Sequence, residues 1–98
     1  PVVRTFMITR DSLVCRKSDV LAAEVGGEVV LMSVAQWHYF GLNAIGTDIW
    51  KRLEQRQSVA ALCAGLAADY DGEAQAIEHD VIELLNKLAA RNLLEPSA

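Results

Sequence analysis

The sequence predicts a single α+β domain in which three antiparallel strands precede three helices. Residues 20–42 contain short β-branched and aromatic runs separated by turn residues. From residue 43 onward the apolar residues recur at helical spacing instead. With 98 residues, of which 52% are hydrophobic, the chain can build one core and is too short for two.

A β-hairpin is predicted at Val20–Val25 and Glu28–Ser33. Gly26 and Gly27 stand between these two runs, and tight hairpin turns need residues that accept positive φ. A turn around residues 34–36 leads into a third strand at residues 37–42, which completes a three-stranded meander. In residues 1–12 the apolar side chains do not recur at a regular spacing, and this segment is expected to form an N-terminal arm.

The first two helices are predicted from their N-caps, because the side chains of Asn43 and Ser58 can accept hydrogen bonds from the free amides of a first helical turn. They place helices at about residues 44–53 and 59–70. At 3.6-residue spacing the side chains expected to be buried are Ile45, Ile49, Trp50, Leu53, Val59, Leu62, Cys63, Leu66 and Ala67.

The third and longest helix is expected over about residues 73–91. Its apolar side chains are Ile77, Val81, Leu84, Leu85 and Leu88. Asn92 follows the helix and tolerates the left-handed conformation in which many helices end. Leu93 and Leu94 are expected to fold back, and residues 96–98 to trail off without regular structure.

The charge pattern disfavours nucleic acid and membrane partners. The net charge is -4 and the nine Lys and Arg residues are scattered, whereas nucleic-acid affinity depends on clustered cations. No stretch approaches the roughly 20 apolar residues of a membrane span, and no signal-peptide pattern opens the chain. A cytoplasmic protein is therefore expected, with Cys15 and Cys63 as reduced thiols.

No catalytic or metal-ligating constellation is found. His79 and Asp80 are neighbours on a helix, where adjacent side chains point about 100° apart, so they are not expected to act as a base and its orienting group. His38 lies on a strand as either a ligand contact or a plain exposed residue. The glycines lack the spacing of a phosphate loop. We therefore expect no enzyme activity, no cofactor and no metal.

The third strand is the most informative segment. Residues 37–42 carry no charge unless His38 is protonated, whereas exposed edge strands are usually protected by Lys, Pro or bulges. One interpretation is that a peptide adds to this edge and places its side chains in an apolar groove. The other is that the aromatic residues cap a small core, with Phe40, Leu42 and Trp50 inside and only Trp37 and Tyr39 left over.

Residues 37–50 combine an aromatic pair with Leu42-Asn43 and Ile49-Trp50, and Asp80-Val81, Leu84-Leu85 and Asn92-Leu93-Leu94 follow in order. This pattern resembles the PqqD-like family of recognition elements for RiPP precursor peptides, meaning ribosomally made peptides that are modified after translation. The family includes the peptide chaperone of PQQ biosynthesis and the small B1 proteins of lasso-peptide pathways. The resemblance covers residues 13–95, with Asn92 in place of the usual Gly and Gly41 in place of a larger residue.

The resemblance implies a winged-helix-like domain that does not catalyse. It would bind the leader region of a precursor peptide as a strand added along the third strand, in a cleft closed by the third helix. The peptide would then pass to a modifying enzyme, such as a radical SAM protein or a leader peptidase. The candidate peptide-binding residues are Trp37, His38, Tyr39, Phe40, Gly41, Ile77, Asp80, Val81, Leu84, Leu85 and Leu88. Some of the helical residues must face the core instead, and Lys87 or Arg91 is expected to meet acidic leader residues.

Other functions stay open at this point. Three helices and a small sheet also make a winged-helix DNA-binding regulator, although the acidic third helix would repel phosphates. A structural subunit, or one domain of a longer peptidase, also fits. The uncharged edge is compatible with a monomer and with an edge-mediated dimer.

Overall fold

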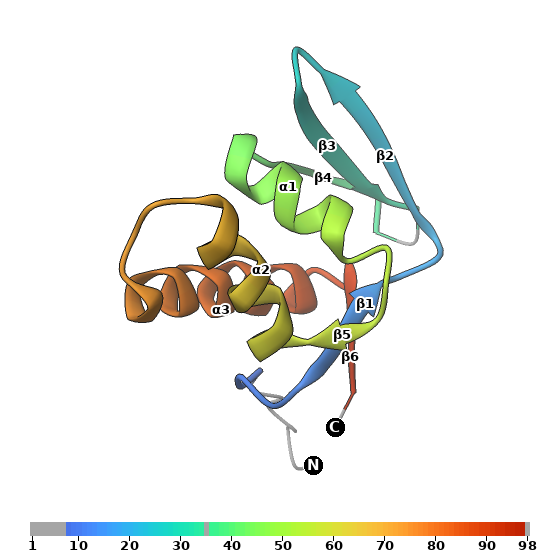
Figure 1. Cartoon of the computed structure of the whole chain (residues 1–98). Coiled ribbons are helices and arrows are strands. Elements are labelled where there is room, and N and C mark those ends of the chain that lie inside the picture. The colour runs from blue at the N-terminus through green and yellow to red at the C-terminus, as the bar shows by residue number, and fades with distance from the viewer. Residues whose placement is uncertain (1–7, 35, 98) are drawn as a thin grey trace.

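The computed structural model describes residues 8–34 and 36–97, which form two small sheets and three helices (Figure 1). Strands β2 (Val20–Val25), β3 (Glu28–Ser33) and β4 (His38–Gly41) form one antiparallel sheet in the order β2-β3-β4. The predicted meander is therefore confirmed. Its third strand begins one residue late, because Trp37 adopts a positive φ of 58° in the turn and its amide donates to the Ser33 carbonyl at 2.8 Å.

The β2–β3 hairpin turns at Gly26 and Gly27, whose φ angles are 61° and 83°. Both values are positive, as the predicted tight hairpin turn requires. Along β3 the side chains of Val29, Leu31 and Ser33 are buried and those between them are half-buried. One face of this sheet therefore packs on the core and the other is open.

The three predicted helices are confirmed as α1 (Ala44–Arg52), α2 (Val59–Asp69) and α3 (Ala74–Ala90). The Asn43 side chain accepts from the Gly46 amide at 2.8 Å, and the Ser58 hydroxyl accepts from the Ala61 amide at 3.1 Å. Asn92 ends α3 with a φ of 57°. Within the described residues, no helix is long and apolar enough to cross a membrane.

A second sheet was not predicted. Strands β1 (Leu13–Arg16), β5 (Gln57–Ser58) and β6 (Leu94–Ser97) pair in the order β5-β1-β6. The expectation that the chain trails off from Pro96 is wrong for residues 96 and 97, because residues 94–97 pair along the whole of β1; residue 98 lies outside the described residues. Leu93 and Leu94 are buried next to β1, and their burial brings the chain end into register.

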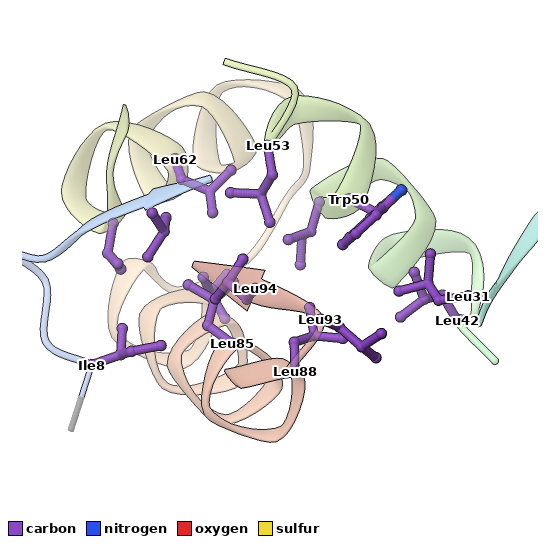
Figure 2. Close-up of a cluster of buried hydrophobic side chains, with 14 of the residues drawn as sticks. Ile8, Leu31, Leu42, Trp50, Leu53, Leu62, Leu85, Leu88, Leu93 and Leu94 are labelled. Carbon is purple, nitrogen blue, oxygen red and sulfur yellow. The ribbon is translucent and has the colours of Figure 1, made fainter. Parts of the chain in front are cut away.

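One core joins both sheets to the helices (Figure 2). Its fully buried large side chains are Leu31, Leu53, Leu62, Leu85, Leu88, Leu93, Val14 and Val59. Of the predicted N-terminal arm, residues 1–7 lie outside the described residues. Ile8 packs into the core and its amide donates to Asn86 Oδ1 at 3.2 Å. The domain boundary at residue 13 stays a prediction.

Two predicted core positions are wrong. Ile45 is 53% exposed, and Ala67 is also exposed. Ile45 belongs to the first turn of α1, where the helix borders an open groove rather than the core. Helical spacing indicates a face of α1 but does not tell whether that face meets packed side chains or an opening.

Candidate functional site

Strand β4 is an open edge of the sheet, since β3 is its only partner within the described residues. The Leu42 amide donates to the Val29 carbonyl at 2.8 Å. Antiparallel strands alternate residues that bond across the ladder with residues that face away. His38 and Phe40 therefore bond to β3, whereas Tyr39 and Gly41 direct their N–H and C=O groups outward. The edge offers these two residues to another strand.

A groove of about 610 Å³ lies beside this edge. Phe40, Gly41 and Leu42 form its sheet side, and α1, the end of α2 and α3 form its other walls. Its apolar lining consists of Phe40, Leu42, Ile45, Ile49, Leu66, Ala76, Ile77, Val81 and Leu84. An open strand edge next to an apolar groove provides both backbone bonding groups and pockets for alternate side chains.

The structure separates the candidate residues of α3 into two sets. Ile77, Asp80 and Leu84 line the groove, and Val81 lines it while being only 2% exposed. Leu85 and Leu88 are fully buried and are not part of the lining, so they are removed from the candidate set. They face the core because α2 and β6 pack on that side of α3.

The strand candidates are also divided. Phe40 and Gly41 line the groove, whereas Trp37, His38 and Tyr39 are exposed and do not. Trp37 is 74% exposed and Tyr39 is 70% exposed, as expected for the two aromatic residues that were not assigned to the core. Tyr39 lies opposite Met32 on the open face of the sheet. Contact of any of these residues with a peptide stays a prediction.

Two cations stand near the C-terminal end of α3. The guanidinium carbon of Arg91 lies 5.5 Å from the centre of the Phe40 ring, which connects α3 to β4. Lys87 Nζ lies 3.5 Å from Glu83 Oε1 and lines the groove. Both side chains are exposed, so their existing contacts leave them free to reorient toward an acidic ligand group.

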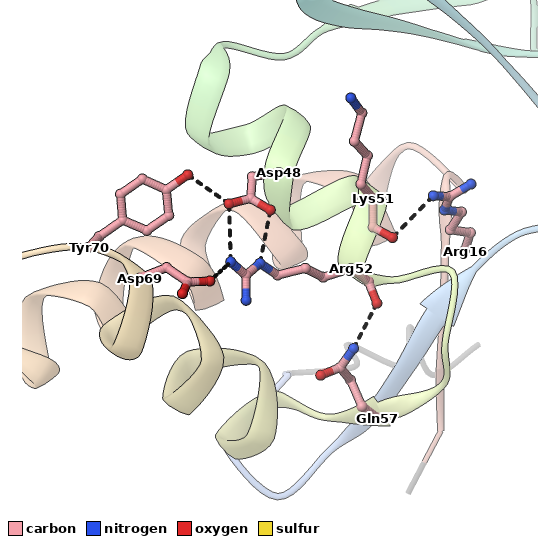
Figure 3. Close-up of polar contacts among 7 residues, drawn as sticks. All are labelled: Arg16, Asp48, Lys51, Arg52, Gln57, Asp69 and Tyr70. Atoms are coloured by element: carbon pink, nitrogen blue, oxygen red, sulfur yellow. Dashed lines mark hydrogen bonds and ion pairs between the residues drawn. The ribbon is translucent and has the colours of Figure 1, made fainter.

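A polar cluster connects the C-terminal end of α2, which forms one wall of the groove, to α1 (Figure 3). Arg52 donates to Asp48 Oδ1 at 2.9 Å and Oδ2 at 3.2 Å, and also to Asp69. The Tyr70 hydroxyl donates to Asp48 Oδ2 at 2.6 Å, and Tyr70 lines the groove. A Cβ on Gly65 would lie 2.8 Å from Arg52 Nη1, so this glycine makes room for the guanidinium.

These contacts change the acidity of two groups. The hydrogen bond from Arg52 holds the pKa of Asp48 below its usual 3.8. The hydrogen bond to the Asp48 carboxylate raises the pKa of Tyr70. Sequence reasoning missed this cluster, although the i,i+4 spacing of Asp48 and Arg52 was a visible signal.

Asp48→Asn is expected to lower the free energy of unfolding by about 1–2 kcal/mol at neutral pH, because charge-assisted hydrogen bonds are lost. A carboxylate whose folded pKa is depressed stabilises the fold above its unfolded value and loses that contribution as the pH falls through the folded value. The difference from wild type should therefore shrink below a pH of about 3.8. Urea unfolding at several pH values measures it, with Glu54→Gln on an exposed site as the control. A difference that stays constant with pH would contradict the assignment.

The remaining reactive side chains are not assembled into a site. His79 Nδ1 and Asp80 Oδ1 do come within 3.5 Å, contrary to the prediction, but both side chains are largely exposed. Cys15 and Cys63 are free thiols, and burial raises the pKa of Cys63. In the part of the chain that the structure describes, no group of three or more His, Cys, Asp or Glu residues is arranged to hold a metal ion.

The same architecture occurs in two solved structures. TbiB1 in complex with the TbiA(beta) leader peptide is 32% identical and superposes with a TM-score of 0.78, covering 86% of this chain and 98% of TbiB1. The second is the PqqD truncation of Methylobacterium extorquens PqqCD, described as a functional, stand-alone RiPP recognition element. It is 21% identical with a TM-score of 0.75, covers 90% of this chain and 94% of its own, and shows the shared fold.

No curated protein matches the chain. Residues 28–94 match the family described as Coenzyme PQQ synthesis protein D, or PqqD. These residues contain strand β3, the open β4 edge and all three helices, and the walls of the groove lie among them. The matched segment exceeds half of the 98 residues, and TbiB1 supports the same assignment over nearly its whole length. The chain belongs to the PqqD family.

Proposed function

We propose that this protein binds the leader region of a ribosomally synthesised precursor peptide as a strand added to β4. The peptide lies in the groove against α3 and is presented to a modifying enzyme or a leader peptidase. The protein itself performs no catalysis and acts in the cytoplasm. Its partners are the precursor peptide and the enzyme that receives it.

The observation that carries this proposal is the open β4 edge beside an apolar groove. Backbone bonds at Tyr39 and Gly41 would supply affinity that does not depend on sequence, and the groove would select apolar side chains. A relative that is 32% identical, TbiB1, was solved with a leader peptide bound. A leader peptide in extended conformation would fill such an edge.

The charge of α3 argues against the DNA-binding alternative. A winged-helix reader inserts a helix into the major groove between phosphates. The side chains that α3 exposes include Glu83, His79 and Asp80, so its surface would repel the backbone. The edge and the groove have no role in that alternative, whereas peptide binding uses both.

Hydrogen exchange with the TbiA(beta) leader peptide tests the proposal. We expect the amides of Tyr39 and Gly41 to gain protection on peptide addition, because they face outward in the free protein. The amides of Ala22 and Glu24 face outward on the opposite edge, β2, and should not change. Protection at β2 alone, or at neither edge when peptide is saturating, would contradict the proposal.

A further inference from the structure

The charge of the groove changes along α3. Near the C-terminal end of the helix the lining carries Lys87, which pairs with Glu83 of the same lining, and Arg91 stands just beyond it, stacked on Phe40 of the strand. Toward the N-terminal end the lining carries three further carboxylates, those of Asp71 and Glu73 before the helix and that of Asp80 in its second turn. Arg91 and Asp80 are separated by 11 residues of helix, which is about 16 Å. An extended peptide spans that distance with about five residues.

Within the described residues, no Lys or Arg side chain forms an ion pair with the acidic end of the groove. Among residues 8–34 and 36–97, no ion pair engages Asp71 or Glu73. Asp80 pairs with His79 among these residues, and His79 is charged only when protonated. The three carboxylates are exposed and therefore available to a ligand cation.

Apolar surface lies next to these carboxylates. Ile45 is 53% exposed and Ile77 is half-buried, and both line the same groove. Ile77 lies next to the loop that carries two of the acids, because a Cβ placed on Gly72 would lie 3.6 Å from its Cδ1. Lysine and arginine side chains have an apolar stem and a charged head, so they complement a surface of this composition.

We propose that the groove selects a peptide with a lysine or arginine about five residues away from the segment that pairs with β4. Its stem packs on Ile45 and Ile77, and its head meets the carboxylates of Asp71, Glu73 and Asp80. This proposal rests on the peptide-binding function proposed above and adds the chemistry of the peptide. The charge order along α3 places this basic residue at the end of the groove that carries Asp71, Glu73 and Asp80.

Selection from a library of random peptides of about 14 residues tests the proposal without a known ligand. The wild-type protein is compared with a triple variant, Asp71→Asn, Glu73→Gln and Asp80→Asn. A control triple variant, Asp11→Asn, Asp19→Asn and Glu95→Gln, removes the same charge at exposed positions outside the groove. Circular dichroism verifies the fold of each variant.

We expect wild type and control to enrich peptides that combine apolar residues with Lys or Arg. The groove variant should retain the apolar enrichment and lose the basic one. An enriched peptide should bind the groove variant about 5- to 10-fold more weakly at about 0.05 M salt. The difference should fall below about 2-fold at about 1 M salt, because exposed ion pairs are screened.

The other outcomes overturn either this inference alone or the peptide-binding function as well. If basic residues are not enriched on wild type, or are enriched equally on the groove variant, the inference is overturned while peptide binding stands. Binding of the enriched peptides to Gly41→Pro with unchanged affinity would overturn the β4-edge function and this inference with it. A selection that enriches no peptide overturns both in the same way.

Discussion

Gly41→Pro is expected to weaken peptide binding by at least about 10-fold while the fold persists. The Gly41 amide faces outward, so proline removes a donor that a peptide strand would use and leaves the β3–β4 ladder intact. The proline ring also occupies the space through which the peptide backbone approaches. A Cβ on Gly41 meets nothing within 4 Å, and Gly41 does not adopt a positive φ, so the backbone there accepts a side chain.

Two matched variants separate this effect from general damage. Gly41→Ala keeps the amide and should bind within about 3-fold of wild type. Ala22→Pro removes an outward amide from the opposite edge, β2, and should leave binding unchanged. Fluorescence anisotropy with the TbiA(beta) leader peptide measures affinity, and thermal unfolding verifies the fold.

The three variants discriminate between edges. If Gly41→Pro binds like wild type, the peptide does not pair with β4. If Ala22→Pro loses binding instead, the peptide uses β2, whose edge is longer and also uncharged except at Glu24. Equal losses in both would indicate that the whole sheet rearranges on binding.

Much of the fold could be predicted because its signals are local. The Gly26-Gly27 turn and the caps Asn43 and Ser58 act through hydrogen bonds within a few residues. The second sheet was missed because its main pairing joins distant segments, as Cys15 opposite Glu95 shows. Neither segment carries a sequence pattern that identifies the other as its partner. Pro96 also argues against a strand at residues 94–97, because proline is rare inside strands.

The candidate site was predictable in outline but not in detail. The uncharged third strand identified the edge, and the resemblance identified α3 as the opposite wall. The polar cluster around Arg52 escaped prediction because Asp69 and Tyr70 come from another helix end. Spacing alone also assigned Ile45 to the core, whereas the groove leaves it exposed.

The sequence could not separate the groove residues of α3 from its core residues. Leu84 and Leu85 are neighbours within one wide apolar stripe, about 100° apart around the helix. Which side of the stripe is covered depends on the packing of α2 and β6, which are set by contacts far along the chain. In the structure Leu85 is fully buried, whereas Leu84 is half-buried and lines the groove.

Substitution of Leu85 is therefore expected to reduce mainly stability, and substitution of Leu84 mainly peptide binding. Leu85→Ala should lower the free energy of unfolding by about 2–5 kcal/mol, because it leaves a cavity in a closed core. For a domain of this size that corresponds to a fall in Tm of about 10 °C or more. Leu84→Ala should cost less than about 1 kcal/mol in stability and weaken peptide binding about 5- to 10-fold, since it removes apolar surface that a bound side chain would cover.

Thermal unfolding measures stability, and anisotropy with the TbiA(beta) leader peptide, recorded at a temperature below the Tm of the weaker variant, measures binding. Ile82→Ala serves as the control, because Ile82 is a half-buried residue of the same helix outside the groove. It should resemble Leu84→Ala in stability and wild type in binding. If Leu84→Ala instead loses as much stability as Leu85→Ala, or binds peptide like the Ile82 variant, then Leu84 supports the core and the peptide does not reach this wall of the groove.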